Sequence, residues 1–382
     1  MQSGMIEIRK VTSRKELKQF VDFRYDLYRN DEYDVPCLFF DEMNTLDKDK
    51  NPAFDFCEAE YFMAFRDGRM VGRIAGIINR KANRRWESRI VRFGWIEFED
   101  DREVSSALIK AVIEWGKDKG MDKIIGPIGF TDMDREGMMI EGFNELGNMY
   151  SNHNFPYYHE HIEALGFEKD NDYMLYKVTL TGEVPEKYEK VARLCEERYN
   201  LHAMKPTRRQ LMKGGLGKQI FGMVNETYKD LYGYSELSDK QIKQYIDSYI
   251  GFADTRLITV VTDGNADDKM VGFAVSIPSF SKALTKIPRG RLFPFGWWHM
   301  LKVLKFHMTD TVDMLLIGVL PEYRVKGANA IIFSDLIKEY ARYGFKYAEA
   351  MPQMEANEKV RSNWQYFDSR QHKRLRCYKK RI

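Results

Sequence analysis

Residues 314–332, MLLIGVLPEYRVKGANAII, carry the clearest structural pattern in the chain. The run from Met314 to Leu320 is apolar apart from one glycine, which predicts a buried strand. Pro321 lacks the backbone N–H that a strand uses for pairing, so we expect strand pairing to end there. A helical pattern begins soon afterwards, at Ala328. The stretch therefore predicts a strand that runs through a short turn into a helix.

The turn itself contains Arg324, Lys326 and Gly327. The first turn of a helix presents unpaired N–H groups and the positive end of the helix dipole. Glycine lets the backbone approach an anion closely, and the two cations add positive charge. Together these features predict a pyrophosphate site. The alternative is an ordinary strand-to-helix turn with exposed cations.

Outward from this turn, the 382-residue chain is long enough for two domains. Both halves show one order of elements: strand, helical segment, three strands, helix, strand, helix, strand. In the first half we expect strands at residues 5–11, 59–66, 70–79, 91–98, 122–128 and 173–180, and helices at 13–29, 103–119 and 153–165.

In the second half we expect strands at residues 201–205, 256–262, 270–277, 311–320, 347–351 and 374–380, and helices at 219–231, 239–250, 328–342 and 357–367. A Gly-, Pro- and charge-containing linker at 181–187 marks the boundary, and a helix at 188–199 follows it. The pattern predicts an α/β fold with mixed sheet, divided into domains 1–182 and 183–382.

The turn resembles the cofactor loop of the GNAT acyltransferases, Arg/Gln-x-x-Gly-x-Gly/Ala, although Asn329 departs from the pattern. The resemblance implies two tandem GNAT-like domains and acyl-CoA as co-substrate. It implies that the loop grips the pyrophosphate, and that the backbone before it holds the pantetheine and polarises the thioester. The residues that we expect to bind the cofactor are Gly318, Val319, Leu320, Arg324, Val325, Lys326, Gly327, Ala328, Asn329 and Ala330.

The equivalent stretch of the first half, residues 95–103, holds five carboxylates and no glycine. Two unit charges about 4 Å apart repel by about 4 kcal/mol at an effective dielectric constant of about 20. We therefore expect acyl-CoA to bind only in the second half, while the first half carries the amine substrate or completes the site.

The first half has its own distinctive run, residues 126–143, with an Asp-x-Asp-x-Glu-Gly string from Asp132. A calcium loop is excluded because its twelfth position is Phe143, where a bidentate Glu is needed. The carboxylates can bind an ammonium group, act as a base, or simply be solvated.

This run, with residues 154–159 and 165–167 and the second-half residues 318–324 and Glu355-x-Asn357, resembles one subgroup of tandem GNAT-like bacterial proteins. That subgroup includes the bacterial ceramide synthases, which join a long-chain acyl-CoA to the amine of a sphingoid base. The resemblance implies an N-acyltransferase whose acceptor is a small-molecule or lipid amine.

Amine attack on a thioester requires a base, because an amine of pKa about 10 is protonated at neutral pH. Glu355, just past the strand at 347–351, is our first candidate, with a helix-capping charge as the alternative. His159 and Asp134 are further candidates. Tyr366 is the candidate acid for the leaving thiolate, as the resemblance implies, or else a packed aromatic.

Net charge, cysteine spacing and the distribution of apolar residues each argue against a class of function. The net charge of +3 gives little support to nucleic-acid binding. The four cysteines match no zinc or redox spacing, so we expect no metal. The first ten residues lack the apolar core of a signal peptide, and no run approaches the roughly 20 apolar residues of a membrane span. We expect a cytoplasmic protein.

Residues 286–308, KIPRGRLFPFGWWHMLKVLKFHM, mix large aromatics with cations and contain no acid. This composition suits contact with a membrane interface, here the inner face of the cytoplasmic membrane, or the cover of an acyl-chain tunnel. A helix packed on the protein core is the alternative. Two other functions stay open: an aminoacyl-tRNA-dependent transferase of the tandem type, and a non-catalytic acyl-CoA or lipid binder.

Overall fold

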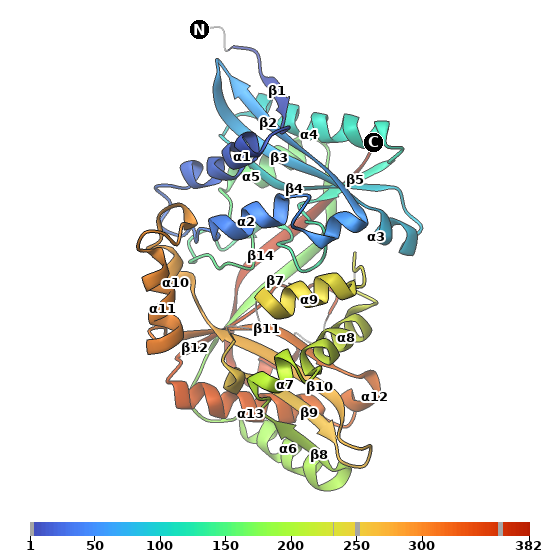
Figure 1. The fold of residues 1–382 in the computed structure, drawn as a ribbon, viewed down its shortest axis with the longest axis vertical. Coiled ribbons are helices and arrows are strands. Elements are labelled where there is room, and N and C mark those ends of the chain that lie inside the picture. The colour runs from blue at the N-terminus through green and yellow to red at the C-terminus, as the bar shows by residue number, and fades with distance from the viewer. Residues whose placement is uncertain (1–3, 232, 249–252, 358–361) are drawn as a thin grey trace.

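The computed structural model describes residues 4–231, 233–248, 253–357 and 362–382. One 14-stranded mixed sheet runs through the whole molecule in the order β1-β2-β3-β4-β5-β14-β7-β12-β11-β10-β9-β8, with β6 beside β14 and β13 beside β7. The molecule is elongated, and the two halves of the chain occupy its two ends (Figure 1).

The first half contains the strands and helices β1 (Glu7–Lys10), α1 (Arg14–Leu27), α2 (Phe39–Leu46), β2 (Cys57–Arg66), β3 (Arg69–Asn79), α3 (Arg80–Arg85), β4 (Ile90–Phe98), α4 (Arg102–Asp118), β5 (Lys123–Gly126), β6 (Met138–Glu141), α5 (Tyr157–Ala164) and β7 (Glu168–Thr179). Helix α4 packs on one face of the sheet and α1 with α2 on the other. Ser13 caps α1: its side chain accepts the N–H of Glu16, and the Glu16 carboxylate accepts the N–H of Ser13.

The second half contains α6 (Glu186–Tyr199), β8 (Leu201–Met204), α7 (Arg208–Met212), α8 (Leu216–Tyr228), α9 (Asp239–Ser248), β9 (Ile258–Asp263), β10 (Lys269–Pro278), α10 (Ser281–Leu284), α11 (Gly296–Phe306), β11 (Thr311–Val319), α12 (Pro321–Arg324), α13 (Ala328–Tyr343), β12 (Tyr347–Ala350), β13 (Gln353–Met354) and β14 (Asp368–Arg381). Helices α13 and α6 cover one face of its sheet, and α8 and α9 cover the other.

The two halves exchange their last strands. Strand β5 of the first half pairs with β14 from the end of the chain, and β12 of the second half pairs with β7 from the first. Strands β7 and β14 also pair with each other, from Thr179 opposite Asp368 to Glu168 opposite Lys379. Both run lengthwise through the middle of the molecule (Figure 1). The predicted boundary at 181–187 falls between β7 and α6, and the division into domains 1–182 and 183–382 stays a proposal.

The expected α/β fold with a mixed sheet is confirmed, with differences in single elements. The expected helix at 357–367 lies partly outside the described residues, and its described part, Ser362–Tyr366, is a 3-10 turn. The last strand starts six residues earlier than expected, at Asp368. Helices α2 and α3 and strand β6 lie where we expected no element.

Candidate functional site

One edge of strand β11 is paired with its parallel neighbour β12 over only part of its length. Strand β12 pairs with it only from Thr311 to Met314, after which the chain turns to β13 and pairs with β7 instead. On the opposite edge β10 continues to Val319, with a register shift at Leu315. Among the described residues, no strand pairs with the β12-facing edge of β11 beyond Met314. A ligand with amide groups can add to such an edge as an extra strand does.

One side chain already occupies this part of β11. The hydroxyl of Tyr228, at the end of α8, donates to the carbonyl oxygen of Ile317 at 3.0 Å. It also accepts the Ile317 N–H at 3.4 Å. Tyr228 therefore satisfies the two backbone groups that an extended ligand would use here, and sequence patterns gave no sign of it.

The turn after β11 leads directly to an uncapped helix. Gly327 has a left-handed φ of 78°, and no side chain caps the N-terminus of α13. A Cβ at Gly327 would lie 2.6 Å from the sulfur of Cys195 on α6, so no other residue fits without movement. The Cys195 thiol in turn donates to the carbonyl oxygen of Lys326 at 2.7 Å. The turn is thus fixed from below by α6, with its helix N-terminus left open to an anion.

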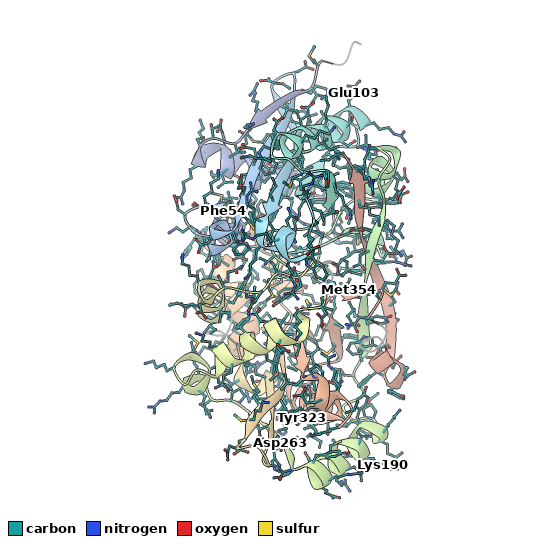
Figure 2. All side chains as sticks on the ribbon, turned by 90° about the vertical axis from the view of Figure 1, so that its right-hand side faces the viewer. Phe54, Glu103, Lys190, Asp263, Tyr323 and Met354 are labelled. Atoms are coloured by element: carbon teal, nitrogen blue, oxygen red, sulfur yellow. The ribbon has the colours of Figure 1, made fainter. Side chains whose placement is uncertain are left out.

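The two predicted cations differ in their contacts. Arg324 is exposed, and its Nε donates to the carbonyl oxygen of Val319 at 2.9 Å. The Lys326 ammonium lies 4.3 Å from the centre of the Tyr323 ring. Tyr323 donates to Asp263 at 2.8 Å, and both side chains lie in the second half (Figure 2). This hydrogen bond ties the turn to β9.

The remaining predicted cofactor residues lie along the same strand, turn and helix start. The Leu320 N–H donates to the carbonyl oxygen of Val271 at 3.0 Å, so it belongs to the sheet on the β10 side. The side chain of Val325 is 89% exposed, at the tip of the turn. Gly318 lies in β11, Ala328 and Ala330 are buried, and Asn329 is half-buried. Their role in binding acyl-CoA stays a prediction.

The matching turn of the first half is built differently. Asp101 caps α4 by accepting the N–H of Glu103 at 2.9 Å, and it pairs with Arg66. A carboxylate therefore stands where the second half leaves its helix N-terminus open. An anion such as pyrophosphate is disfavoured there.

Two of the predicted catalytic residues are held in ion pairs or surface contacts. Glu355 pairs with Lys169 and with Arg374, the latter at 2.8 Å. The Tyr366 hydroxyl contacts the ammonium of Lys187, and the ring is 39% exposed. Trp364 is buried against Phe333 and Tyr176. Base and acid roles for Glu355 and Tyr366 stay predictions that no contact described here supports.

The other two candidates lie in the first half. The ring of His159 stacks on Phe143 with ring centres 6.2 Å apart, and its Nδ1 is buried without a hydrogen bond. The Asp134 carboxylate accepts the N–H of Thr131 at 3.0 Å. Burial raises the pKa of Asp134 to about 6, against the hydrogen bonds that lower it. The structure does not bring either residue together with Glu355 or Tyr366 in any contact described.

Sequence reasoning missed a buried polar cluster beside the start of the free edge. Asp313 of β11 and Glu349 of β12 stand opposite each other in register. Both oxygens of Asp313 lack hydrogen-bond partners, and burial and the Glu349 charge raise its pKa. Glu349 lies 3.3 Å from His372 and 3.6 Å from Lys373, both on β14. The sequence did contain one signal for this cluster, because Asp313 and Glu349 are each the only acid in an otherwise largely apolar strand.

One depression of the described surface lies away from the turn. It has a volume of about 490 Å³ and is lined by Arg256, His307, Glu339, Arg342 and Tyr343. Glu339 lies 11 residues along α13 from Ala328, or about 16 Å along the axis, so this depression is separate from the turn. A cavity of about 70 Å³ adjoins Glu349 and His372. No group of three metal-ligating side chains occurs in the part of the chain that the structure describes.

Two solved structures share this architecture over nearly the whole chain. A tandem GNAT protein from the clavulanic acid biosynthesis pathway matches with a TM-score of 0.57 at 10% identity, over 98% of each chain. A GCN5-related N-acetyltransferase from Sphaerobacter thermophilus matches with a TM-score of 0.55 at 11% identity, over 98% of this chain and 95% of that one. The fold is that of a tandem GNAT protein. Identities this low establish the GNAT fold alone.

Sequence comparison adds two relatives of this chain. Bacterial ceramide synthase of Caulobacter vibrioides is 27% identical over 316 residues, covering 82% of this chain and 80% of that protein. Protein YghO of Escherichia coli is 27% identical over 389 residues, covering 98% of this chain and 95% of that protein. No family model matches. The chain has the tandem GNAT fold and is similar in sequence to bacterial ceramide synthase.

Proposed function

We propose that this protein is an N-acyltransferase that moves an acyl group from acyl-CoA to a primary amine. One arrangement carries the proposal: the free edge of β11 leads straight into the uncapped N-terminus of α13. A ligand with an extended amide arm and a terminal pyrophosphate matches that sequence of groups. The turn adds the positive charges of Arg324 and Lys326.

The chemistry follows from the reacting groups. The neutral amine attacks the thioester carbonyl, a C–N bond forms and the C–S bond breaks. Backbone N–H groups of β11 near Ile317 are the donors available to the developing oxyanion once Tyr228 releases them. Glu355, His159 and Asp134 stay candidate bases and Tyr366 a candidate acid. The contacts of Glu355 and Tyr366 described above count against those two.

The acceptor is proposed to be a long-chain sphingoid base. The similarity to bacterial ceramide synthase over 82% of the chain supports this. The alternative is a smaller amine, which the GNAT fold accommodates equally well.

We also propose peripheral membrane contact through residues 286–308, at the inner face of the cytoplasmic membrane. Exposed aromatic side chains of this segment are Phe293, Phe295, Trp297, Trp298 and Phe306. Val303 faces inward, and Lys302 and Lys305 remain beside the aromatics. Arg289 and Arg291 instead pair with Asp22 of α1, so they fasten the segment to the first half. No helix of the described chain has the length and apolar character needed to cross a bilayer.

Calorimetric titration with palmitoyl-CoA and acetyl-CoA tests the donor. The protein should bind at least one of them, and a variant with Arg324→Glu and Gly327→Glu should lose that binding while remaining folded by circular dichroism. Mass spectrometry after incubation with palmitoyl-CoA and sphinganine tests the acceptor, with N-palmitoyl sphinganine as the expected product. Absence of binding to both donors overturns the proposal.

A further inference from the structure

Two acids of the loop between β5 and β6, Asp132 and Glu136, are half-buried. Both carboxylate oxygens of Asp132 are shielded from solvent and make no hydrogen bond. Burial and the charge of Glu136 both raise the pKa of Asp132. An uncompensated buried carboxylate costs several kcal/mol, so a proton or a cation must neutralise it.

The cations near the loop do not neutralise both acids. The guanidinium of Arg92 donates to the carbonyl oxygens of Gly129 and Gly233, both at 3.1 Å. Arg135 pairs with Glu42 of α2. Arg92 is thus the cation that faces Asp132 and Glu136, and its N–H groups are directed elsewhere. The loop therefore carries an excess of buried negative charge.

A third polar group points at the same place. Tyr173 of β7 is 4% exposed, and its hydroxyl has no hydrogen-bond partner. Burial raises the pKa of this hydroxyl, and the charge of Glu136 raises it further. A buried hydroxyl without a partner is costly, so its presence beside two acids marks a place where a hydrogen-bonding ligand fits.

The loop lies beside the free edge of β11. Met133 packs into the cluster that contains Leu316 and Leu320 of the second half. The centres of the Tyr234 and Tyr228 rings lie 6.3 Å apart. Burial raises the pKa of Tyr234, and the charge of Asp132 raises it further. Tyr228 in turn holds Ile317. From the other side, Met354 of β13 packs against Tyr173, and Figure 2 places Met354 near mid-height, where the halves meet.

The protonation of the acids suits proton transfer near neutral pH. Burial raises the pKa of Glu136 to about 7, the charge of Asp134 adds to this, and Tyr173 and Arg92 oppose it. Burial and the charge of Glu136 also raise the pKa of Asp132. Nearby Cys377 and Tyr234 titrate far higher, because burial raises the pKa of both. Two acids that interact in this way release their protons in steps that belong to the pair.

We propose that Asp132, Glu136 and Tyr173 form the subsite that holds the protonated amino group of the acceptor and removes its first proton. The inference rests on the proposed function. The first half thereby supplies the amine site and the second half the acyl-CoA site, which gives both halves a part in one reaction.

The ammonium of the acceptor passes one proton to an ionised carboxylate of the Asp132 and Glu136 pair, which becomes a carboxylic acid. The free amine attacks the thioester carbonyl, and the C–S bond breaks. The second proton leaves the new amide nitrogen and ends on the thiolate of CoA. The carboxylic acid then loses its proton to water, so the pair returns to its starting state.

A binding experiment tests this without relying on turnover. Sphinganine and N-acetylsphinganine, presented in neutral detergent micelles, share their hydrocarbon chain and hydroxyl groups, but the first carries a protonated amine where the second carries an uncharged acetamide. The wild-type protein should bind sphinganine at least tenfold more tightly. Glu136→Gln and Asp132→Asn should each reduce that preference to below about threefold, while Glu160→Gln, an exposed acid on α5, should leave it unchanged.

A second measurement separates a direct role from a structural one. Calorimetry in two buffers of different ionisation enthalpy reports the protons released when sphinganine binds at pH 7. The wild type should release a fraction of a proton on binding, because the positive charge of the ammonium lowers the pKa of the partly protonated Glu136, and Glu136→Gln should release less. If Glu136→Gln unfolds, Tyr173→Phe serves instead, since it removes only the hydroxyl that acts on Glu136.

Equal affinity for the two lipids, no binding of sphinganine, or variants that keep the full preference would each overturn the inference. Loss of palmitoyl-CoA binding is a separate result. A protein that distinguishes the two lipids but binds neither CoA ester refutes the proposed function and supports the amine subsite.

Discussion

The hydroxyl of Tyr228 hydrogen-bonds both the carbonyl oxygen and the N–H of Ile317, on the edge of β11 that β12 leaves. A ligand that pairs with this edge must displace the phenol. Helix α8 therefore competes with the ligand for the same two backbone groups, and the strength of that competition can be measured.

Tyr228→Phe should bind palmitoyl-CoA about three- to tenfold more tightly than the wild type. The substitution removes two hydrogen bonds that binding must otherwise break, each worth about 0.5–1.5 kcal/mol. Calorimetric titration measures the change. Tyr61→Phe loses a comparable buried bond, to the carbonyl oxygen of Leu46 at 2.8 Å, and should leave the affinity unchanged. Weaker binding by Tyr228→Phe would contradict the competition.

Gly327→Ala should weaken palmitoyl-CoA binding at least tenfold and lower the free energy of unfolding. The left-handed conformation costs an alanine about 1–2 kcal/mol, and the new Cβ would press on Cys195. Gly344→Ala, at the other end of α13, has a φ of 71° and no atom within 4 Å of the new Cβ. It should show the conformational cost alone, with affinity within about twofold of the wild type. Equal losses of affinity in the two variants would refute the role of the turn.

Lys373→Met should lower the free energy of unfolding by about 3–5 kcal/mol near neutral pH, because it leaves Glu349 charged and buried. Burial alone would raise the pKa of Glu349, but Lys373 and His372 lower it to about 2, from an ordinary 4.5. In the wild type this contribution is present above pH 4.5 and is lost as the pH falls towards 2.

In Lys373→Met the pKa of Glu349 should rise instead, so stability should fall with increasing pH. Urea denaturation across the pH range measures both trends. Lys379→Met breaks a more exposed pair, 3.1 Å from Asp170, and should cost under about 1 kcal/mol. A pH dependence identical to that of the wild type would show that Lys373 does not govern Glu349.

Replacing Trp297 and Trp298 by serine should reduce binding to phosphatidylglycerol vesicles about tenfold or more, since interfacial aromatics supply much of the apolar contact. Vesicle co-sedimentation measures this. Trp86→Ser removes an indole of similar exposure, 44%, from the first half and is the matched control. Lys302→Gln with Lys305→Gln should weaken binding only at low salt, because surface charges are screened. Unchanged binding by the double tryptophan variant would remove the membrane proposal.

Local signals in the sequence were enough to predict the order of the main strands and the turn after β11. Each strand carries its own apolar run, and Pro321 and Gly327 mark the turn chemically. The short helices α2 and α3 were not predicted because eight and six residues make only about two helical turns, too few for a clear periodic pattern. Trp364 and Phe367, near the end of the helix expected at 357–367, both contact Phe333.

The candidate site was less accessible to sequence reasoning. Asp313 and Glu349 are single acids 36 positions apart, and only the register of β11 and β12 brings them opposite each other. Tyr228 is one of 22 tyrosines, and nothing local distinguishes it. The exchange of β7 and β14 depends on which of two similar strands fits each sheet edge, a choice made by tertiary packing.

The exchange of last strands between the two halves also affects how the chain folds during synthesis. Strand β5 pairs with β14, which is translated last of the described strands, so one edge of β5 stays unpaired until synthesis is nearly complete. Each half expressed alone should expose an unpaired strand edge and aggregate. The nascent chain should depend on chaperones until β14 pairs with the sheet. Loss of that one strand would undo both lobes at once.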